Sequence, residues 1–159
     1  RPVLLHPESR GTVRLSSANP GAKVRISLNA LDTENDIKTL REGFRRAREV
    51  LLQGPLDRYR GRELDPGSEV ASDDEIDHWM RATAITVHHP SCTCAMGTGE
   101  NAVLDPDLSV QGVDGLRVVD AAAMPDLVSG NINACVLMMA EKASDMIHGR
   151  APLASVDVP

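Results

Sequence analysis

The stretch Thr86-Val-His-His-Pro-Ser-Cys-Thr-Cys-Ala-Met-Gly97 places two histidines, a proline, two thiols and a terminal glycine within twelve residues. Proline at position 90 disfavours the α-helical region for His89, so the backbone carrying this imidazole is restricted. Imidazole is the side chain that exchanges a proton near neutral pH. The stretch therefore predicts an active-site loop with His89 as a general base, and a hydrogen-bonded structural histidine is the alternative.

Other side chains of this loop allow different chemistry. In an extended segment His88 points away from His89, which makes it the weaker candidate for catalysis. A nucleophilic Cys94 assisted by His89 is a further alternative. The ligand types His88, His89, Cys92, Cys94 and Cys135 also suggest zinc, but structural zinc sites usually use two ligand pairs with C-x₂₋₄-C spacing. Cys92 and Cys94 are separated by one residue, so we expect no metal site.

A second polar cluster, Ser129-Gly-Asn-Ile-Asn133, opens a long apolar segment that predicts a helix from about 131 to 148, ended by Gly149. One asparagine of this cluster is accounted for as a helix N-cap. Two amides at a helix start suggest more, because free N–H groups and the helix dipole stabilise an anion there. Asn131 and Asn133 are therefore candidate binding residues.

The first half of the chain predicts strands and amphipathic helices. Residues 11–16 and 23–28 alternate apolar and polar side chains around an Asn-Pro-Gly turn, as expected of a pair of half-buried strands. Apolar residues at three- and four-residue steps predict a helix over 33–53, and a capping-box spacing from Ser72 predicts another over 72–83. Short strands are expected at 102–104 and 115–120. The fold class is α+β.

Composition excludes two kinds of partner. The formal charge of −6 is spread along the chain without a basic stripe, so binding to nucleic acid is not expected. No run reaches about 18 apolar residues, so no membrane span is expected. The odd count of three cysteines implies no disulfide framework and favours a reducing, cytoplasmic setting. Aromatic residues make up only 2% of the chain, which suggests that some apolar packing comes from elsewhere.

Three blocks of the sequence resemble the glucose–methanol–choline oxidoreductases. Residues 89–97 are similar to that family's H-P-x-G-T-C-x-M-G block. Residues 103–125 resemble its V-D-x-x-L-x-V-x-G-(V/I)-x-G-L-R-V-x-D-A-S-x-M-P block, and residues 129–147 resemble its closing S-x-N-x-N-A … I-A-E-K-A-A-D-x-I helix. The blocks follow one another in family order and spacing, over about residues 83–149.

The resemblance implies a flavoprotein that oxidises a small alcohol to a carbonyl compound with FAD. His89 matches the catalytic histidine, which takes the hydroxyl proton as hydride leaves for flavin N5. Asn131 matches the second catalytic position, His or Asn in the family, which holds the substrate oxygen. A non-catalytic assembly module with the family fold and a small zinc protein are the alternatives.

The resemblance also implies where the cofactor and substrate bind. Asp120 and Ala121 match positions near the FAD pyrophosphate and ribitol. Asn133 and Ala134 match the helix start that faces the flavin pyrimidine edge. His88 and Cys92 are substrate-pocket candidates; Cys92 stands where the family usually has glycine.

The family's strand–GxGxxG–helix unit, which binds the ADP part of FAD, does not occur in this chain. The chain is therefore expected to be the C-terminal portion of an α/β FAD-binding fold whose N-terminal portion is a partner. Residues 1–84 are expected to form the substrate side. Residues 85–150 would carry the loop 86–97, called the histidine loop below, together with a closing strand and the C-terminal helix of the FAD domain. Residues 151–159 would form a loose tail.

Overall fold

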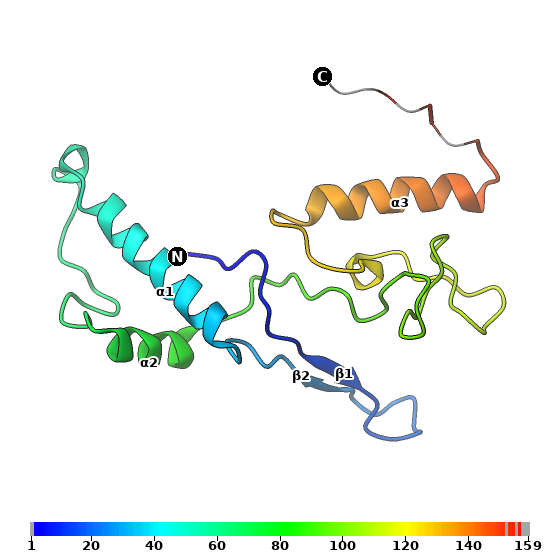
Figure 1. The fold of residues 1–159 in the computed structure, drawn as a ribbon, viewed down its shortest axis with the longest axis horizontal. Coiled ribbons are helices and arrows are strands. Elements are labelled where there is room, and N and C mark those ends of the chain that lie inside the picture. The colour runs from blue at the N-terminus through cyan, green and yellow to red at the C-terminus, as the bar shows by residue number, and fades with distance from the viewer. Residues whose placement is uncertain (1, 152, 155, 157–159) are drawn as a thin grey trace. The chain divides into compact units, whose positions relative to one another are not determined.

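The computed structural model describes residues 2–151, 153–154 and 156 (Figure 1). By its internal contacts the chain divides into an N-terminal unit, Arg1–Val87, and a C-terminal unit, His88–Pro159. The described residues form α-helices and a two-stranded antiparallel sheet, which confirms the α+β class. The tail expected over 151–159 lies partly outside the described residues.

A short hairpin opens the N-terminal unit. Strand β1 (Thr12–Arg14) pairs antiparallel with β2 (Arg25–Ser27), with Val13 opposite Ile26. The Asn19 side chain accepts a hydrogen bond from the Gly21 N–H at 2.9 Å and so closes the turn. The predicted pairing is thus confirmed, but the strands are shorter than 11–16 and 23–28, with three residues each. The expected half-burial is wrong for the described structure, because all six residues are exposed and no further element covers either face of the hairpin.

Helix α1 (Glu34–Leu51) follows the hairpin and confirms the helix predicted over 33–53, with Thr33 as its cap. Thr33 has an extended backbone, and its hydroxyl accepts a hydrogen bond from the Asp36 N–H at 3.3 Å. Ile37 and Phe44 are buried on one face of the helix. A short 3₁₀ turn, η1 (Gly54–Leu56), follows the helix. Pro55 lies in its first turn, where a backbone N–H would have no partner within the turn, so the missing N–H of proline costs nothing.

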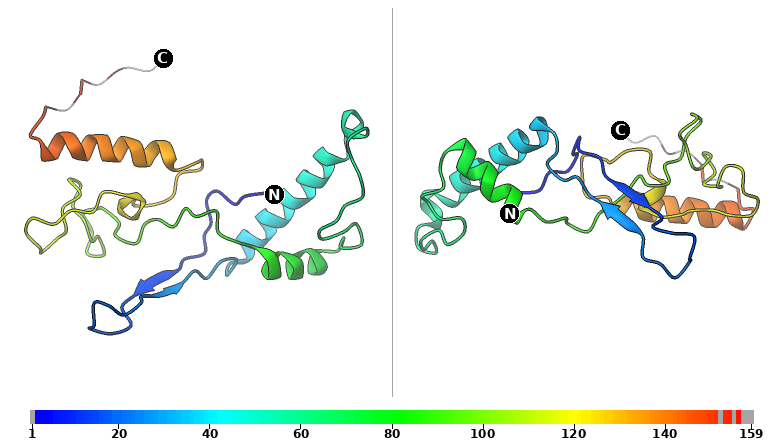
Figure 2. Two further views of the ribbon diagram at one scale, coloured as in Figure 1. Left: turned by 180° about the vertical axis from the view of Figure 1, so that it is seen from behind. Right: turned by 90° about the horizontal axis from the view of Figure 1, so that it is seen from below.

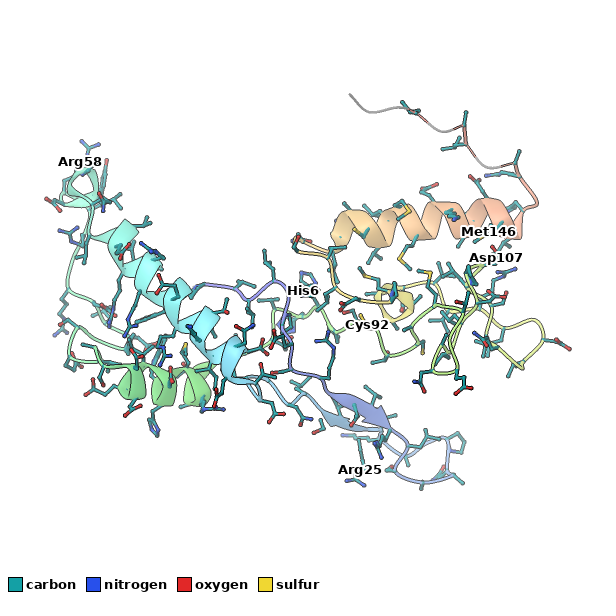
Figure 3. The ribbon with its side chains drawn as sticks, in the orientation of Figure 1. His6, Arg25, Arg58, Cys92, Asp107 and Met146 are labelled. Carbon is teal, nitrogen blue, oxygen red and sulfur yellow. The ribbon has the colours of Figure 1, made fainter. Side chains whose placement is uncertain are left out.

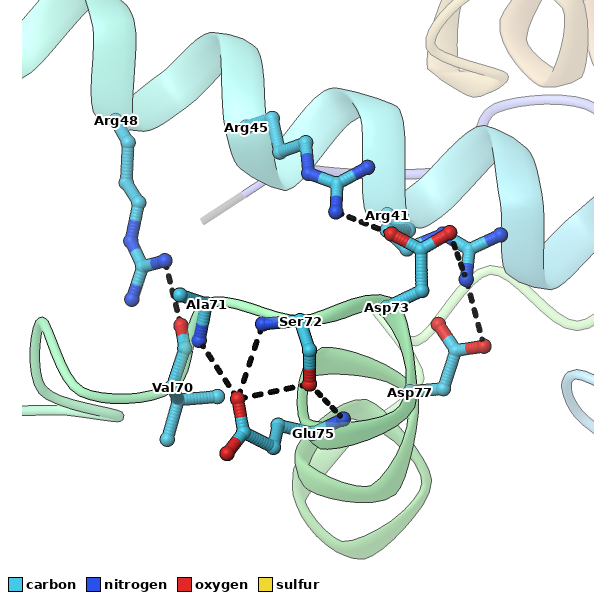
Figure 4. Close-up of polar contacts among 9 residues, drawn as sticks. All are labelled: Arg41, Arg45, Arg48, Val70, Ala71, Ser72, Asp73, Glu75 and Asp77. Carbon is cyan, nitrogen blue, oxygen red and sulfur yellow. Dashed lines mark hydrogen bonds and ion pairs between the residues drawn. The ribbon is translucent and has the colours of Figure 1, made fainter.

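Helix α2 (Asp73–Thr83) begins with the predicted capping box. The Ser72 hydroxyl accepts from the Glu75 N–H, and the Glu75 carboxylate accepts from the Ser72 N–H at 3.0 Å (Figure 4). Ile76 and Met80 are buried, as the apolar spacing requires. The helix packs against α1 around one apolar cluster, in which Trp79 is partly buried.

Arginine side chains of α1 join it to α2 and to the preceding loop. Arg41 contacts Asp73 and Asp77, each at 3.0 Å, and Arg45 pairs with Asp73 (Figure 4). Arg48 donates to the carbonyl oxygens of Gly67 and Val70 at 2.8 and 2.7 Å. These contacts fix the 55–71 connection, which has little regular structure, against α1.

A buried carboxylate ties the start of the chain to α1. Asp36 is 1% exposed and accepts from the Glu8 and Ser9 N–H groups, each at 2.8 Å, and from the Ser9 hydroxyl. Burial alone would raise the pKa of Asp36, but the hydrogen bonds from Ser9, Glu8 and Thr33 outweigh it and lower the pKa. Asp36 is therefore a charged, satisfied core residue.

The C-terminal unit contains few regular elements before its helix. Among the described residues, the strands expected at 102–104 and 115–120 occur only as single bridges: Leu104 to Met96, Leu104 to Val110, and Ser109 to Arg117. The reason is that a strand needs a continuous partner, and the neighbouring segments supply only isolated backbone pairs. Leu116 is 50% exposed, so this apolar run is not covered on both faces within the described residues.

Helix α3 (Asn133–Ile147) covers the core of the C-terminal unit. Met139 and Ala143 are buried, whereas Leu137 and Met138 are more than half exposed. The predicted helix is confirmed, but one of its faces is uncovered in the described structure. Gly149 follows with a φ of 65°, the left-handed conformation that glycine adopts without strain. Figure 2 shows each element of the two units in two further orientations.

Candidate active site

The predicted catalytic histidine lies on a loop without regular secondary structure. The chain leaves α2 at Ala84 and continues through residues 85–91 as an irregular segment. His89 is exposed, and its imidazole makes no hydrogen bond or ion pair with the described residues. An exposed, uncommitted imidazole has the accessibility that a general base requires.

His88 and Cys92 adopt left-handed backbone conformations on either side of His89. Their φ angles are 64° and 66°, in a region of backbone conformation that residues other than glycine rarely adopt. Cys92, which is labelled in Figure 3, is half-buried. Its thiol lies 3.4 Å from the Ser91 hydroxyl. The positive φ gives a physical reason for the glycine that the related sequence block usually has at this position.

The loop is held by backbone hydrogen bonds at alternate residues. The N–H groups of Cys92, Cys94 and Met96 donate to the carbonyl oxygens of three consecutive alanines, 121 to 123, at 3.1, 2.9 and 3.0 Å. These alanines form a 3₁₀ turn, η2 (Ala121–Ala123). The contact therefore joins the two predicted site residues Cys92 and Ala121 directly.

Asp120 caps this turn. Its carboxylate accepts from the Ala122 N–H at 2.7 Å, and its carbonyl accepts from the Ala123 N–H at 3.1 Å. Asp120 is exposed, so only part of its hydrogen-bonding capacity is used within the chain. The turn is thus shaped by Asp120 and aligned with the histidine loop by its own carbonyl groups.

Asn131 closes the start of α3. Its side-chain oxygen accepts from the Asn133 N–H at 3.0 Å, although the cap residue itself is Ile132, which has no capping side chain. Asn131, Asn133 and Ala134 are all exposed. The first turn of α3 carries no acidic residue, so the partial positive charge of the helix start is not neutralised by its own side chains.

One apolar cluster connects the two candidate regions. Cys92 and Cys94 of the loop and Ala121 of η2 pack against the same buried core as Ile132, the residue between the two asparagines. No hydrogen bond joins His89 to Asn131. The cluster is therefore the feature that brings the histidine loop and the α3 start to one core.

The sequence did not reveal the role of Ala122 and Ala123, whose carbonyl oxygens hold Cys94 and Met96. Alanines give no chemical signal of this kind. The alternation of apolar and small residues over 92–96 is the one feature that would have suggested backbone pairing.

The thiols and imidazoles do not assemble a metal site in the described part of the chain. Cys92, Cys94 and Cys135 are free, and no group of three or more His, Cys, Asp or Glu side chains converges there. Among the same residues, no helix combines the length and apolar character needed to cross a bilayer.

Comparison with known proteins gives a family match. The family model described as GMC oxidoreductase matches residues 7–140. Among curated proteins, the chain is 48% identical over 151 residues to an oxygen-dependent choline dehydrogenase of Paraburkholderia phytofirmans, a match that covers 95% of this chain and 27% of that protein. The chain thus spans about a quarter of the length of the curated relatives it matches.

Solved structures show the same similarity. Pyridoxine 4-oxidase from Mesorbium loti is 37% identical with a TM-score of 0.84, covering 93% of this chain and 29% of that one. An FAD-dependent oxidoreductase from Chaetomium thermophilum is 32% identical with a TM-score of 0.83, covering 92% and 26%. Fold and sequence therefore point to the same family.

Proposed function

Because the chain belongs to the GMC oxidoreductases, we propose that it carries the catalytic portion of an enzyme that oxidises an alcohol to a carbonyl compound. The cofactor is FAD, as in the related flavoenzymes. The observation that carries the proposal is the shared apolar cluster, onto which both the histidine loop and the start of α3 pack.

His89 is proposed as the base. Its exposed imidazole accepts the hydroxyl proton of the alcohol on a ring nitrogen, which leaves the substrate oxygen with developing negative charge. The hydrogen bonds from Cys92, Cys94 and Met96 to the η2 carbonyls fix the loop three residues after His89. This support limits the motion of the base relative to the α3 start.

Asn131 is proposed to hold the substrate oxygen. Its side-chain oxygen is already occupied by the Asn133 N–H, so its amide nitrogen is the group left to donate. An N–H donor aimed at an oxygen that gains negative charge stabilises the transition state more than the ground state. The structural capping role and the catalytic role of Asn131 therefore use different atoms.

The residues at the start of α3 fit the flavin end of the cofactor. The first turn carries no acid, and its first two residues, Asn133 and Ala134, are exposed. The Asn133 N–H is bonded to the Asn131 side chain, so the N–H of Ala134 and the helix dipole are proposed to face the anionic ring edge. When bound, FAD supplies the hydride acceptor. Asp120 and Ala121 are proposed to lie toward its pyrophosphate and ribitol.

A further portion of the protein is needed to hold the nucleotide. The chain contains no GxGxxG sequence, and the part of it that matches the first curated relative covers 27% of that protein. We assign residues 85–150 to the FAD-binding side and 1–84 to the substrate side of the complete enzyme. The exposed Leu137 and Met138 on α3 are then positions expected to be covered by the nucleotide-binding portion.

Choline is the alcohol to test first, since the curated relatives are named choline dehydrogenases. An ordinary alcohol is the alternative substrate, because the chain has few aromatic rings to surround a quaternary ammonium group. His88 and Cys92 are proposed to contact the substrate. The Cys92 side chain would make the substrate pocket narrower than the glycine that related sequences usually have at this position.

Anaerobic mixing of the complete enzyme with choline, benzyl alcohol or ethanol tests the proposal. We expect one of these alcohols to bleach the visible flavin absorption, and the corresponding aldehyde to form in equal amount. If FAD is bound but none of a wide set of alcohols reduces it, the assembly-module alternative is favoured. If the complete protein binds no flavin, the proposal is wrong.

A further inference from the structure

A groove in the N-terminal unit is lined by none of the residues assigned to alcohol oxidation. It has a volume of about 510 Å³ and follows one side of α2, with walls that include Val70, Trp79 and Ala82. Small-molecule sites commonly have volumes of about 300–1,000 Å³ and mostly apolar walls. The groove is therefore large enough for a small organic ligand.

The indole ring of Trp79 is held in a fixed orientation at this groove. Its centroid lies 5.1 Å from that of Phe44, with the two planes inclined by 46°. Its Nε1–H donates to an oxygen of Asp65 at 2.9 Å. A hydrogen bond to a carboxylate increases the electron density of the indole, and a fixed ring requires no reordering when a ligand binds.

The charged groups at the groove are anionic. Asp65, Asp74 and Glu75 line it. Among the residues that the structure describes, no lysine or arginine lines the groove, and His78 is the remaining titratable residue there. The hydrogen bond from the Ser72 N–H, together with those from the Ser72 hydroxyl and the Ala71 N–H, lowers the pKa of Glu75. Asp74 is exposed and forms no ion pair or hydrogen bond through its side chain with the described residues.

We propose that this groove binds a small organic ammonium cation over the ring of Trp79. The electron-rich face of tryptophan attracts a cation, and the nearby carboxylates add a Coulombic attraction. The apolar walls match alkyl groups on nitrogen rather than the tightly held water shell of a metal ion. A neutral alkyl compound would fill the same space but would gain nothing from the carboxylates.

Fluorescence of the 159-residue chain tests the proposal, because Trp79 is its sole tryptophan. Tetramethylammonium chloride is titrated against sodium chloride at equal ionic strength and against tert-butyl alcohol, a neutral molecule of similar shape. We expect a saturable change in Trp79 emission with tetramethylammonium only. Equal responses to tert-butyl alcohol, or a response no larger than that to sodium chloride, would overturn the proposal.

Two variants with the same change of charge locate the effect. Asp74→Asn removes a carboxylate at the groove, whereas Glu34→Gln removes an exposed one from the first turn of α1. Since exposed charge pairs contribute little, we expect Asp74→Asn to raise the Kd for tetramethylammonium about two- to fivefold and Glu34→Gln to leave it unchanged. Circular dichroism checks that both variants keep their helices.

Equal weakening in both variants would show that the chain's net charge, not the groove, attracts the cation. No weakening in either would show that the carboxylates play no part. Either result contradicts the proposed site, even if some fluorescence change is seen.

Discussion

The two units of the chain are held together in different ways. In the N-terminal unit, side chains carry the structure: arginines of α1 pair with carboxylates, and Asp36 fastens residues 8 and 9 to the helix. In the C-terminal unit, backbone groups do most of this work, as in the three hydrogen bonds from the histidine loop to η2.

This difference fits the proposal that the catalytic base lies in the C-terminal unit. Backbone hydrogen bonds fix residues 92–96 without using their side chains. The His89 imidazole forms no hydrogen bond or ion pair with the described residues, as the proposed base requires. Where side chains provide the hydrogen bonds, as around α1 and α2, they are committed to the fold. Four predictions test this division, in order of decreasing effect.

Replacing His89 should have the largest effect, and on catalysis alone. In the complete enzyme, His89→Ala is expected to lower kcat by about 10²-fold or more, because a general base is lost. FAD content and the unfolding midpoint should stay close to those of the parent. His148→Gln is the matched control. The ring Nδ1 of this exposed histidine lies 2.8 Å from the Ser144 carbonyl oxygen, and its loss should leave kcat unchanged. If FAD content fell as much as kcat, the result would show that His89 supports FAD binding or the fold and is not the base.

Truncating a core side chain of the C-terminal unit should lower the stability of that unit and leave the unfolding transition of the N-terminal unit unchanged. Leu104 is fully buried, so Leu104→Ala should cost about 2–5 kcal/mol of unfolding free energy in that unit. In urea unfolding of the 159-residue chain, Trp79 fluorescence, which reports on the N-terminal unit, should keep its midpoint. Circular dichroism, to which α3 contributes together with α1 and α2, should start to fall at a lower urea concentration than in the parent. Leu153→Ala, at a residue that is 90% exposed, is the control. Equal shifts in both signals would show that the units unfold together.

Removing the charge of Asp36 should weaken the N-terminal unit in a pH-dependent way. Asp36→Asn should cost about 2 kcal/mol at pH 7, since hydrogen bonds to a charged group are lost. The pKa of Asp36 is lowered on folding, so its contribution is complete above the unfolded value, near pH 4, and disappears as the pH falls through the folded value.

The stability difference between parent and Asp36→Asn should therefore shrink in acid. Urea unfolding followed by Trp79 fluorescence from pH 7 down to pH 2.5 measures it. The control Asp32→Asn changes an exposed carboxylate just before α1 and should show a much smaller difference at every pH. If the difference in unfolding free energy between the parent and Asp36→Asn stayed constant with pH, Asp36 would not be ionised in the folded chain.

The smallest effect is expected at the start of α2. Ser72→Ala removes the capping hydroxyl and should cost about 1 kcal/mol. Thermal unfolding followed by Trp79 fluorescence measures the loss, and Ser68→Ala, an exposed serine of the preceding loop, should cause none. Equal melting temperatures for the parent and Ser72→Ala would mean that packing against α1, and not the cap, sets the start of the helix.

The sequence was most informative where structure is local. Thr33, Ser72 and Gly149 mark helix ends through contacts within a few residues, and each lies where the spacing predicted. It was least informative over 102–120, where strands were expected and only single bridges form. A strand depends on partners distant in the chain, which residue alternation cannot supply.

The same distinction applies to the site. The sequence by itself determined which groups are chemically able to act, an imidazole after a restricted backbone and an amide before a helix, because residue type and local conformation suffice for that. Only the tertiary structure decided that Cys92 lies against Ala121, and that the histidine loop and Ile132 pack on one core. Those contacts join residues tens of positions apart, and their free energy comes from burial and backbone pairing that no local pattern encodes.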